Sequence, residues 1–273
     1  MVDNGTATVR ASSSIVLLRE QPALEVFMVE RPARGSFPGA HVFPGGVVDV
    51  ADASADIYAL CDGLDDTEAS ARLNLDQHGL AYYVAAIRET FEETGYLLAR
   101  KADGSAVGAA VLGDAAADWR EQLSSGRRTL LDLCRAFGVR PAVDRLVYNS
   151  YWLTPRSEKR RYATRFFLTS VPEGPAGRHD GAELVDSFWI APPAALSATS
   201  GLRLMPPTQA QLGDLAGCDT VADATDAARE RFASAGVACV FPQVSIKPDG
   251  GRVFSYAEYP AAPDPVEFAG ARS

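Results

Sequence analysis

Cysteine is scarce in this chain, with four residues at positions 61, 134, 218 and 239 among 273. They form no CxxC pair and have no near neighbours, so neither a disulfide framework nor a structural zinc site is expected. Isolated thiols are typical of a reducing compartment, and the cytoplasm is the expected location. No apolar run approaches the ~20 residues that a membrane helix requires. The polar stretch before Ala11 also lacks the apolar segment of a secretory signal.

Basic residues are also in the minority. The chain has 26 Lys and Arg against 35 Asp and Glu, a formal net charge of −9. Such a surface repels polyphosphate backbones and lipid headgroups, which disfavours broad nucleic-acid binding and a membrane partner. The 47% apolar and 22% charged content is otherwise that of an ordinary globular protein.

The pattern of apolar residues predicts strands mixed with helices of unequal length. Alternating or β-branched runs predict strands at 14–18, 24–30, 41–43, 47–48, 145–153, 162–169 and 185–190. Spacings of three and four predict helices at 51–80, 82–98, 106–137, 192–197, 208–215 and 221–236. This mixture indicates an α+β fold rather than a regular βαβ repeat. We expect one domain in which 51–80 and 106–137 are helical insertions.

Three acidic residues share one face of the 82–98 helix. Glu89, Glu92 and Glu93 stand at i, i+3 and i+4, opposite the apolar stripe. Like charges at these spacings repel, so the arrangement favours a bound cation, and carboxylate oxygens are the ligand type of Mg²⁺ or Mn²⁺. Arg88 stands four residues before Glu92 and is placed to pair with it. The alternative is a solvated acidic face on an amphipathic helix.

A second segment, Phe43-Pro-Gly-Gly46, offers a backbone with little side-chain bulk that can approach a metal or a phosphate closely. Together with Arg88-Glu-Thr-Phe-Glu-Glu-Thr-Gly95 it resembles the nudix box. The pattern of that box is Gly, five residues, Glu, seven residues and then Arg-Glu-U-x-Glu-Glu-x-Gly-U, where U is apolar. Here Arg88 follows Gly46 by 42 positions instead of 14, so 28 residues have been inserted. Asp52 stands where the pattern has its first Glu.

An interrupted box of this kind is similar to the nudix branch related to peroxisomal coenzyme A diphosphatases. The segments that carry this likeness are 37–49, 161–167, 183–189 and 204–208, so the resemblance spans about residues 12–215. It implies a nudix-type α/β/α sandwich with a mixed sheet. Residues 216–273 are expected to add a C-terminal helix and an extended tail packed on the same domain.

The resemblance also implies an activity and a set of site residues. Nudix enzymes hydrolyse a diphosphate linked to a nucleoside with the help of one to three divalent ions. The metal ligands implied here are Glu89, Glu92, Glu93 and the carbonyl of Gly46. The implied catalytic residues are Glu89 as ligand or general base, Glu93, Arg88 as the residue that orients the carboxylates, and Glu183 as a base from outside the box. The candidate substrate-binding residues are Arg31, Arg34, Phe43 and Gly45. The alternatives are solubility of the loop for the two arginines and core packing for Phe43.

Several functions stay open at this stage. Coenzyme A or an acyl-coenzyme A is the first substrate to test, with cleavage into 3',5'-ADP and phosphopantetheine as the family expectation. ADP-ribose, NADH, dinucleoside polyphosphates and capped RNA are the alternatives within the superfamily. A nudix-fold nucleotide sensor without catalysis and a structural protein with an acidic helix are the alternatives outside catalysis. Dimers are frequent in this superfamily, so a homodimer is a further expectation.

Overall fold

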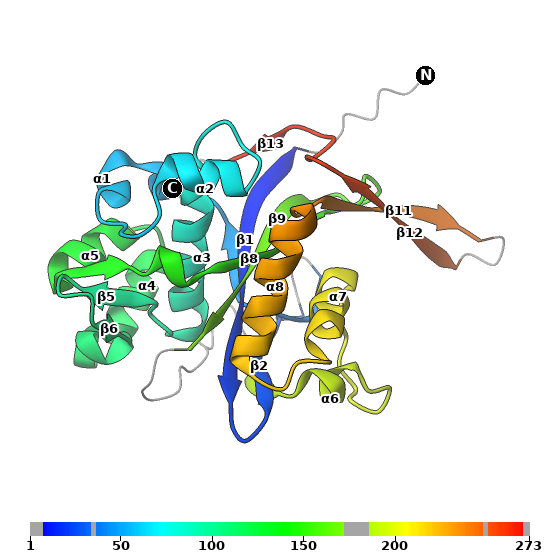
Figure 1. Ribbon diagram of the computed structural model, residues 1–273, viewed down its shortest axis with the longest axis horizontal. Helices are drawn as coiled ribbons and strands as arrows, with labels where there is room; N and C mark the ends of the chain where they lie inside the picture. The colour runs from blue at the N-terminus through cyan, green and yellow to red at the C-terminus, as the bar shows by residue number, and fades with distance from the viewer. Residues whose placement is uncertain (1–7, 34–36, 172–185, 248–250, 270–273) are drawn as a thin grey trace.

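The computed structural model describes residues 8–33, 37–171, 186–247 and 251–269. Its centre is a mixed sheet with helices on both faces (Figure 1). The strand order is β10 (Asp186–Ile190), β2 (Leu24–Glu30), β1 (Val9–Glu20), β9 (Arg161–Ser170), β8 (Val147–Leu153), β11 (Cys239–Ile246) and β12 (Arg252–Tyr259). The predicted strands at 14–18 and 24–30 lie in β1 and β2, which form a hairpin and pair antiparallel next to their connecting turn. No helix in the described residues is long and apolar enough to span a membrane.

The central strand β1 positions the glycine-rich segment. One of its edges pairs in parallel with β9 along ten residues, from Val9 opposite Arg161 to Leu18 opposite Ser170. Its other edge is divided, because β2 pairs only with the end of β1 and β4 (Gly45–Val47) pairs with Ser12–Ser14. Two short strands complete this edge, β3 (His41–Val42) beside β2 and β13 (Val266–Glu267) beside β1. The Phe43–Gly46 segment therefore lies against the middle of the sheet.

Two core clusters fill the two faces of the sheet. Side chains of β1 alternate between them, so that Ile15 and Leu17 belong to one cluster and Val16 and Leu18 to the other. The first face is covered by α3 (Gly79–Thr94), and the second by α6 (Pro192–Leu196), α7 (Pro206–Leu215) and α8 (Val221–Ala235) (Figure 1). A strand that is buried on both faces has a continuous run of apolar residues, and β1 has such a run at Ile15–Leu18. The architecture is the α/β/α sandwich with a mixed sheet that the resemblance implies.

Both expected insertions are helical. The first contains η1 (Val50–Ala53), α1 (Ala55–Tyr58) and α2 (Asp66–Arg72), and the second contains η2 (Ala109–Ala115), α4 (Ala116–Ser124) and α5 (Leu130–Phe137). No pattern of residues predicts the small sheet beside the second insertion. This sheet consists of β5 (Ala99–Lys101), β6 (Ala106–Val107) and β7 (Val139–Pro141), followed by η3 (Val143–Arg145). Strands of two or three residues are too short to show an alternating pattern.

The helix predicted at 82–98 occupies 79–94 instead. It ends early because Gly95 adopts a left-handed conformation, with φ of 77°, and its N–H donates to the carbonyl of Phe91 at 2.9 Å. Leu98 therefore lies beyond the helix and not on its apolar stripe. At the other end, a Cβ on Gly79 would lie 2.3 Å from the backbone nitrogen of Ser70, so α2 packs directly on the first turn of α3.

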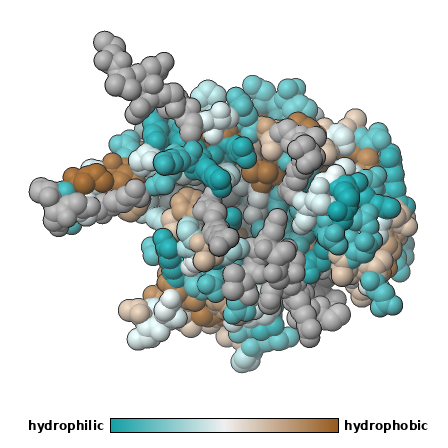
Figure 2. All heavy atoms as spheres, turned by 180° about the vertical axis from the view of Figure 1, so that it is seen from behind, coloured by the Kyte–Doolittle hydropathy of each residue, from teal (hydrophilic) through white to brown (hydrophobic). Residues whose placement is uncertain are grey.

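The C-terminal strands form an arm. Only Cys239 and Val240 of β11 pair with β8, and the β11–β12 hairpin continues away from the body (Figure 1). Large apolar side chains are exposed on it, among them Ile246 at 66% and Phe254 at 38% (Figure 2).

Candidate active site

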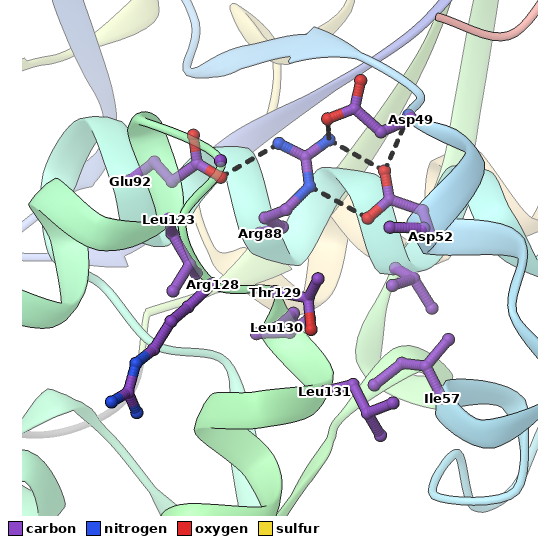
Figure 3. A pocket seen from close by; sticks show the side chains of 13 residues that line it. Asp49, Asp52, Ile57, Arg88, Glu92, Leu123, Arg128, Thr129, Leu130 and Leu131 are labelled. Carbon is purple, nitrogen blue, oxygen red and sulfur yellow. Dashed lines mark hydrogen bonds and ion pairs between the residues drawn. The ribbon is translucent and has the colours of Figure 1, made fainter. Parts of the chain in front are cut away.

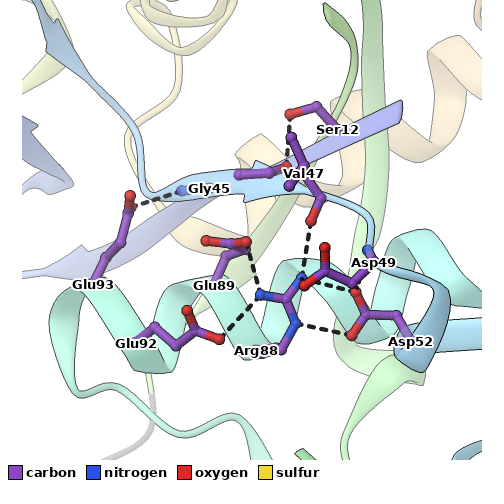
Figure 4. A network of polar contacts seen from close by, with 10 residues as sticks. Ser12, Gly45, Val47, Asp49, Asp52, Arg88, Glu89, Glu92 and Glu93 are labelled. Carbon is purple, nitrogen blue, oxygen red and sulfur yellow. Dashed lines mark hydrogen bonds and ion pairs between the residues drawn. The ribbon is translucent and has the colours of Figure 1, made fainter. Parts of the chain in front are cut away.

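The glycine-rich segment and α3 approach each other so closely that only glycine fits between them (Figure 4). The backbone N–H of Gly45 donates to Oε2 of Glu93 at 2.9 Å. A Cβ on Gly46 would lie 2.4 Å from the carboxyl carbon of Glu89, and one on Gly45 would lie 2.3 Å from the carbonyl oxygen of Ser13. The two halves of the interrupted box therefore meet, although 42 positions separate Gly46 from Arg88.

Two serines of β1 hold the glycine-rich backbone in this position. The hydroxyl of Ser12 donates to the carbonyl of Gly46 at 2.7 Å, and that of Ser14 donates to the carbonyl of Pro44 at 2.8 Å. Gly46 also stands opposite Ser13 in the antiparallel pairing of β4 with β1. Sequence reasoning missed these serines because nothing along the chain links them to a segment some 30 residues later.

Arg88 is the centre of a buried cluster of charges (Figure 4). Its Nε and Nη2 donate to the two carboxylate oxygens of Asp52 at 2.9 and 2.8 Å. Its Nη1 donates to Glu89 at 2.7 Å and to Glu92 at 3.0 Å. Nη2 also donates to the carbonyl of Val47 at 2.9 Å, which ties α3 to β4. The predicted pairing of Arg88 with Glu92 is therefore present, and Asp52 adds a two-pronged contact of the kind that fixes guanidinium orientation.

Burial distinguishes this cluster from a solvated acidic face. Exposure is 5% for Arg88, 5% for Glu89, 1% for Glu92 and 7% for Glu93, and every residue of α3 is buried. Burial disfavours the charge on Arg88, but the carboxylates of Asp52, Glu89 and Glu92 outweigh it and raise the pKa of the guanidinium well above its ordinary value. The alternative of an exposed acidic helix is therefore wrong, because the two insertions cover the face that the helix would otherwise present to water.

Asp52 occupies the place that the box pattern predicts. It stands six positions after Gly46, directly before the long insertion departs, and it is 2% exposed. Besides binding Arg88, its Oδ2 accepts the backbone N–H of Asp49 at 2.9 Å. The carboxylate of Asp49 lies 3.7 Å from Arg88, a contact that sequence reasoning missed. The shorter Asp therefore provides a carboxylate where the pattern has Glu.

The second insertion contributes a residue that the sequence did not indicate. Arg120 of α4 donates to the carbonyl of Glu92 at 3.1 and 3.2 Å and to the carbonyl of Glu93 at 2.8 Å. These carbonyls belong to the last turn of α3, where helical partners are lacking and a cation is favourable. Arg120 thereby fixes the end of the helix that carries the candidate ligands.

A cavity of about 100 Å³ lies beside the Arg88 cluster (Figure 3). Arg88, Glu92 and Asp52 form its polar wall. The apolar wall comes from both insertions, with Ile57 from the first and Leu123, Leu130 and Leu131 from the second. The insertion at 51–80 thus shapes a pocket next to the candidate site.

The remaining predicted site residues are spread more widely. Arg31 is half-buried at the end of β2, and its backbone N–H donates to the carbonyl of Ala40 at 3.0 Å. Phe43 was predicted to contact substrate, but its ring is 3% exposed and packs in the second core cluster. It is therefore a core residue, because the sheet and its helices enclose it. Arg34 and Glu183 lie outside the described residues.

The donor chemistry fits a hard divalent cation. Glu89, Glu92 and Glu93 supply carboxylate oxygens, and the close packing at Gly46 leaves no room for a side chain between its carbonyl and Glu89. Within the described residues, no three His, Cys, Asp or Glu side chains already converge as a metal cluster. The site thus offers the right ligand type. One oxygen each of Glu89 and Glu92 accepts a hydrogen bond from Arg88, and one oxygen of Glu93 accepts the N–H of Gly45.

Comparisons with known proteins agree with this geometry. The family model described as the NUDT19 Nudix domain matches residues 73–215, which is more than half of the chain. The fold and the carboxylate-bearing helix define a Nudix protein, and the chain belongs to the NUDT19 Nudix domain family.

Individual relatives are consistent with that family. Human acyl-coenzyme A diphosphatase NUDT19 is 33% identical over 210 residues, which cover 65% of this chain and 56% of the human protein. The chicken protein of the same name is 32% identical over 212 residues, which cover 63% of this chain and 55% of the chicken protein. The chain thus spans little more than half the length of these relatives. A crystal structure of a Nudix hydrolase from Alicyclobacillus acidocaldarius superposes with a TM-score of 0.66 and 28% identity, covering 81% of this chain and 96% of that one.

Proposed function

We propose that this protein is a divalent-metal-dependent Nudix hydrolase that cleaves the diphosphate of coenzyme A or an acyl-coenzyme A. The observation that carries the proposal is the contact of Gly45 and Gly46 with Glu93 and Glu89. Folding brings the backbone and the carboxylates of an interrupted box into one site, where a Cβ on Gly46 would collide with the Glu89 carboxylate.

The substrate assignment has a separate support. The two relatives described above are named acyl-coenzyme A diphosphatases. Hydrolysis would form a bond from a water oxygen to phosphorus and break the bridging P–O bond, giving 3',5'-ADP and phosphopantetheine or its acyl derivative. The half-buried Arg31 is the described residue best suited to bind phosphate from the loop side, since guanidinium groups form strong hydrogen bonds with phosphate oxygens.

Each residue of the cluster has a role in this proposal. Glu89, Glu92, Glu93 and the Gly46 carbonyl hold Mg²⁺ or Mn²⁺. Bound divalent ions supply charge neutralisation of the diphosphate and Lewis-acid polarisation. Glu89 or Glu93 accepts the proton of the attacking water, with Glu183 as the candidate base from outside the box. Arg88 does not react, but it fixes the carboxylates of Glu89 and Glu92.

The charge balance supports a metal requirement. Around Arg88 the structure places four carboxylates, those of Asp49, Asp52, Glu89 and Glu92, against one guanidinium. This excess of negative charge repels a diphosphate, and divalent cations would reverse that repulsion.

The test is cleavage of coenzyme A, acetyl-coenzyme A, ADP-ribose, NADH, diadenosine polyphosphates and nucleoside triphosphates, with Mg²⁺ or Mn²⁺ and with EDTA. The native protein is compared with Glu93→Gln and with the control Glu121→Gln, which alters an exposed glutamate paired with Arg127. We expect metal-dependent cleavage of coenzyme A that Glu93→Gln loses and Glu121→Gln keeps. If the protein prefers another diphosphate, the proposed metal-dependent mechanism stands but coenzyme A is rejected as its substrate. Tight nucleotide binding without any turnover would favour the alternative of a nudix-fold nucleotide sensor without catalysis.

Three further proposals accompany this one. We propose a cytoplasmic location because Cys61, Cys134, Cys218 and Cys239 are all free thiols. We propose that residues 12–215 and 216–273 form one domain, since β11 pairs with β8 and β13 with β1. A homodimer also remains a prediction, for which sedimentation velocity is the direct test.

A further inference from the structure

A second cavity, of about 240 Å³, lies on the α3 side of the sheet and away from the Arg88 cluster. Its walls come from the segment Leu73–Leu75 after α2, from Tyr82 of α3, from Tyr151 of β8, from Arg165 of β9 and from the chain at 260–266. It shares no lining residue with the cavity beside Arg88. The cavity is therefore separate from the site described above.

Arg165 is the feature of this cavity that requires explanation. Its side chain is 2% exposed. Nη2 donates to the carbonyl of Leu73 at 3.0 Å, and the guanidinium carbon lies 4.3 Å from the ring centre of Tyr82 and 4.1 Å from that of Tyr151. Nε and Nη1 are buried and have no hydrogen-bond partner in the part of the chain that the structure describes. Buried donors are normally satisfied, so two on one guanidinium indicate a missing acceptor.

The charge of Arg165 is not balanced by its neighbours. Burial raises the pKa of Tyr151 and that of Cys239 to about 12, and it also raises the pKa of Tyr82, although the Arg165 charge opposes each shift. These groups are therefore neutral at physiological pH, whereas an arginine side chain stays charged. The nearby Tyr148 is neutral for the same reason, because burial raises its pKa.

The one carboxylate among the described residues of this wall has other partners. Asp264 pairs with Arg161 at 2.6 Å and with Arg156 at 2.6 Å. Burying a charge without a counterion is strongly unfavourable, and contacts with aromatic rings offset only part of that penalty. A ligand that brings one negative charge would remove the imbalance.

We propose that this cavity binds a small organic monoanion, with a carboxylate group at Arg165 and an apolar body against the surrounding wall. The carboxylate would approach the guanidinium end-on and accept a hydrogen bond from Nη1. Leu73, Leu75 and Val266 belong to the lining, which suits an apolar body rather than a hydrated inorganic ion. Among the described lining residues, Arg165 is the one cation without a carboxylate partner and Asp264 adds a negative charge, which favours one negative charge on the ligand over two or more. The proposal does not depend on the hydrolase activity.

The probe for the test is 4-bromobenzoate, with 4-bromobenzyl alcohol as its neutral counterpart and inorganic phosphate as the competing anion. Titration calorimetry near neutral pH, in a buffer free of carboxylates, measures the three affinities. We expect the carboxylate to bind roughly tenfold more tightly than the alcohol and the phosphate, a difference that one charged contact can provide. In a crystal of the complex, the anomalous signal of bromine should then lie in this cavity, between the segment 73–75 and the side chains of Tyr82, Tyr151 and Arg165.

Two variants show whether Arg165 is responsible. Arg165→Met replaces an uncompensated charge with an apolar chain of similar length, a change that buried sites often tolerate. It should abolish the preference for the carboxylate. The control is Arg19→Met, because Arg19 also stacks on an aromatic ring, Trp189 at 4.2 Å, but already pairs with Glu25. It should bind like the native protein.

The following outcomes would overturn the proposal: equal affinity for acid and alcohol, equal or tighter binding of phosphate, unchanged binding by Arg165→Met, or bromine at another place. If Arg165→Met does not fold, the position of bromine shows whether the ligand binds at Arg165, because it is measured on the native protein.

Discussion

The contact between Asp52 and Arg88 leads to a strong prediction about stability. Asp52 is 2% exposed and accepts two guanidinium N–H groups, from Nε at 2.9 Å and from Nη2 at 2.8 Å. In Asp52→Asn one of the two oxygens becomes an amide nitrogen, which cannot accept. Arg88 then loses a charged partner and faces an amide donor inside a buried cluster.

The expected magnitude follows from burial. Removing one partner of a buried ion pair costs about 3–5 kcal/mol. Arg88 keeps its contacts with Glu89 and Glu92, so we expect the lower end, about 3 kcal/mol. For a protein of this size that corresponds to a melting temperature lower by roughly 6–12 °C. Urea unfolding followed by circular dichroism measures the free energy, and calorimetry measures the melting temperature.

Asp62→Asn is the matched control. Asp62 also contacts an arginine through both oxygens, with Arg140 Nη1 at 2.9 and 2.7 Å. The two side chains are, however, 45% and 37% exposed, and exposed ion pairs contribute about 0–1 kcal/mol. The reasoning is refuted if the two variants lose similar stability, or if Asp52→Asn loses less than about 1 kcal/mol.

Other variants test the remaining contacts. Gly46→Ala forces a Cβ to within 2.4 Å of the Glu89 carboxyl carbon, so hydrolysis should fall about 100-fold in a steady-state assay. Gly213→Ala, whose Cβ meets nothing within 4 Å, should leave it unchanged. Arg120→Met removes the hydrogen bonds to the last turn of α3 and should lower the unfolding free energy by about 2 kcal/mol in urea. The two arginines that pair with Asp264 lower its pKa, so its contribution to stability is present above the unfolded-state pKa and lost as pH falls through the lowered one. Asp264→Asn should therefore be less stable than the native protein near pH 7, and the difference should disappear as pH falls through the lowered pKa of Asp264, so a constant difference in the urea midpoint would contradict this.

Local patterns predicted much of the fold. The β1–β2 hairpin, β8, β9 and the helices after residue 190 are close to their predicted ranges, because apolar periodicity and turn residues are local properties of the chain. The errors also have local causes. The apolar spacing extends the predicted helix to Leu98, whereas Gly95 ends it at Thr94, and the strands of the small sheet are too short to show any period.

Local sequence patterns were sufficient to assign the family and the residue types of the candidate site. Phe43–Gly46 and the carboxylates of Glu89, Glu92 and Glu93 were recognisable because their spacing follows a known pattern, and family membership agrees with it. The tertiary structure decided which groups touch. In the folded chain Asp52 binds Arg88, 36 positions away, and Ser12 of β1 donates a hydrogen bond to the carbonyl of Gly46. The acidic face of α3 is buried. The tertiary structure also left Arg165 beside tyrosine rings without a carboxylate partner among the described residues. Such contacts depend on the path of the chain between distant residues, and periodicity carries no information about that path.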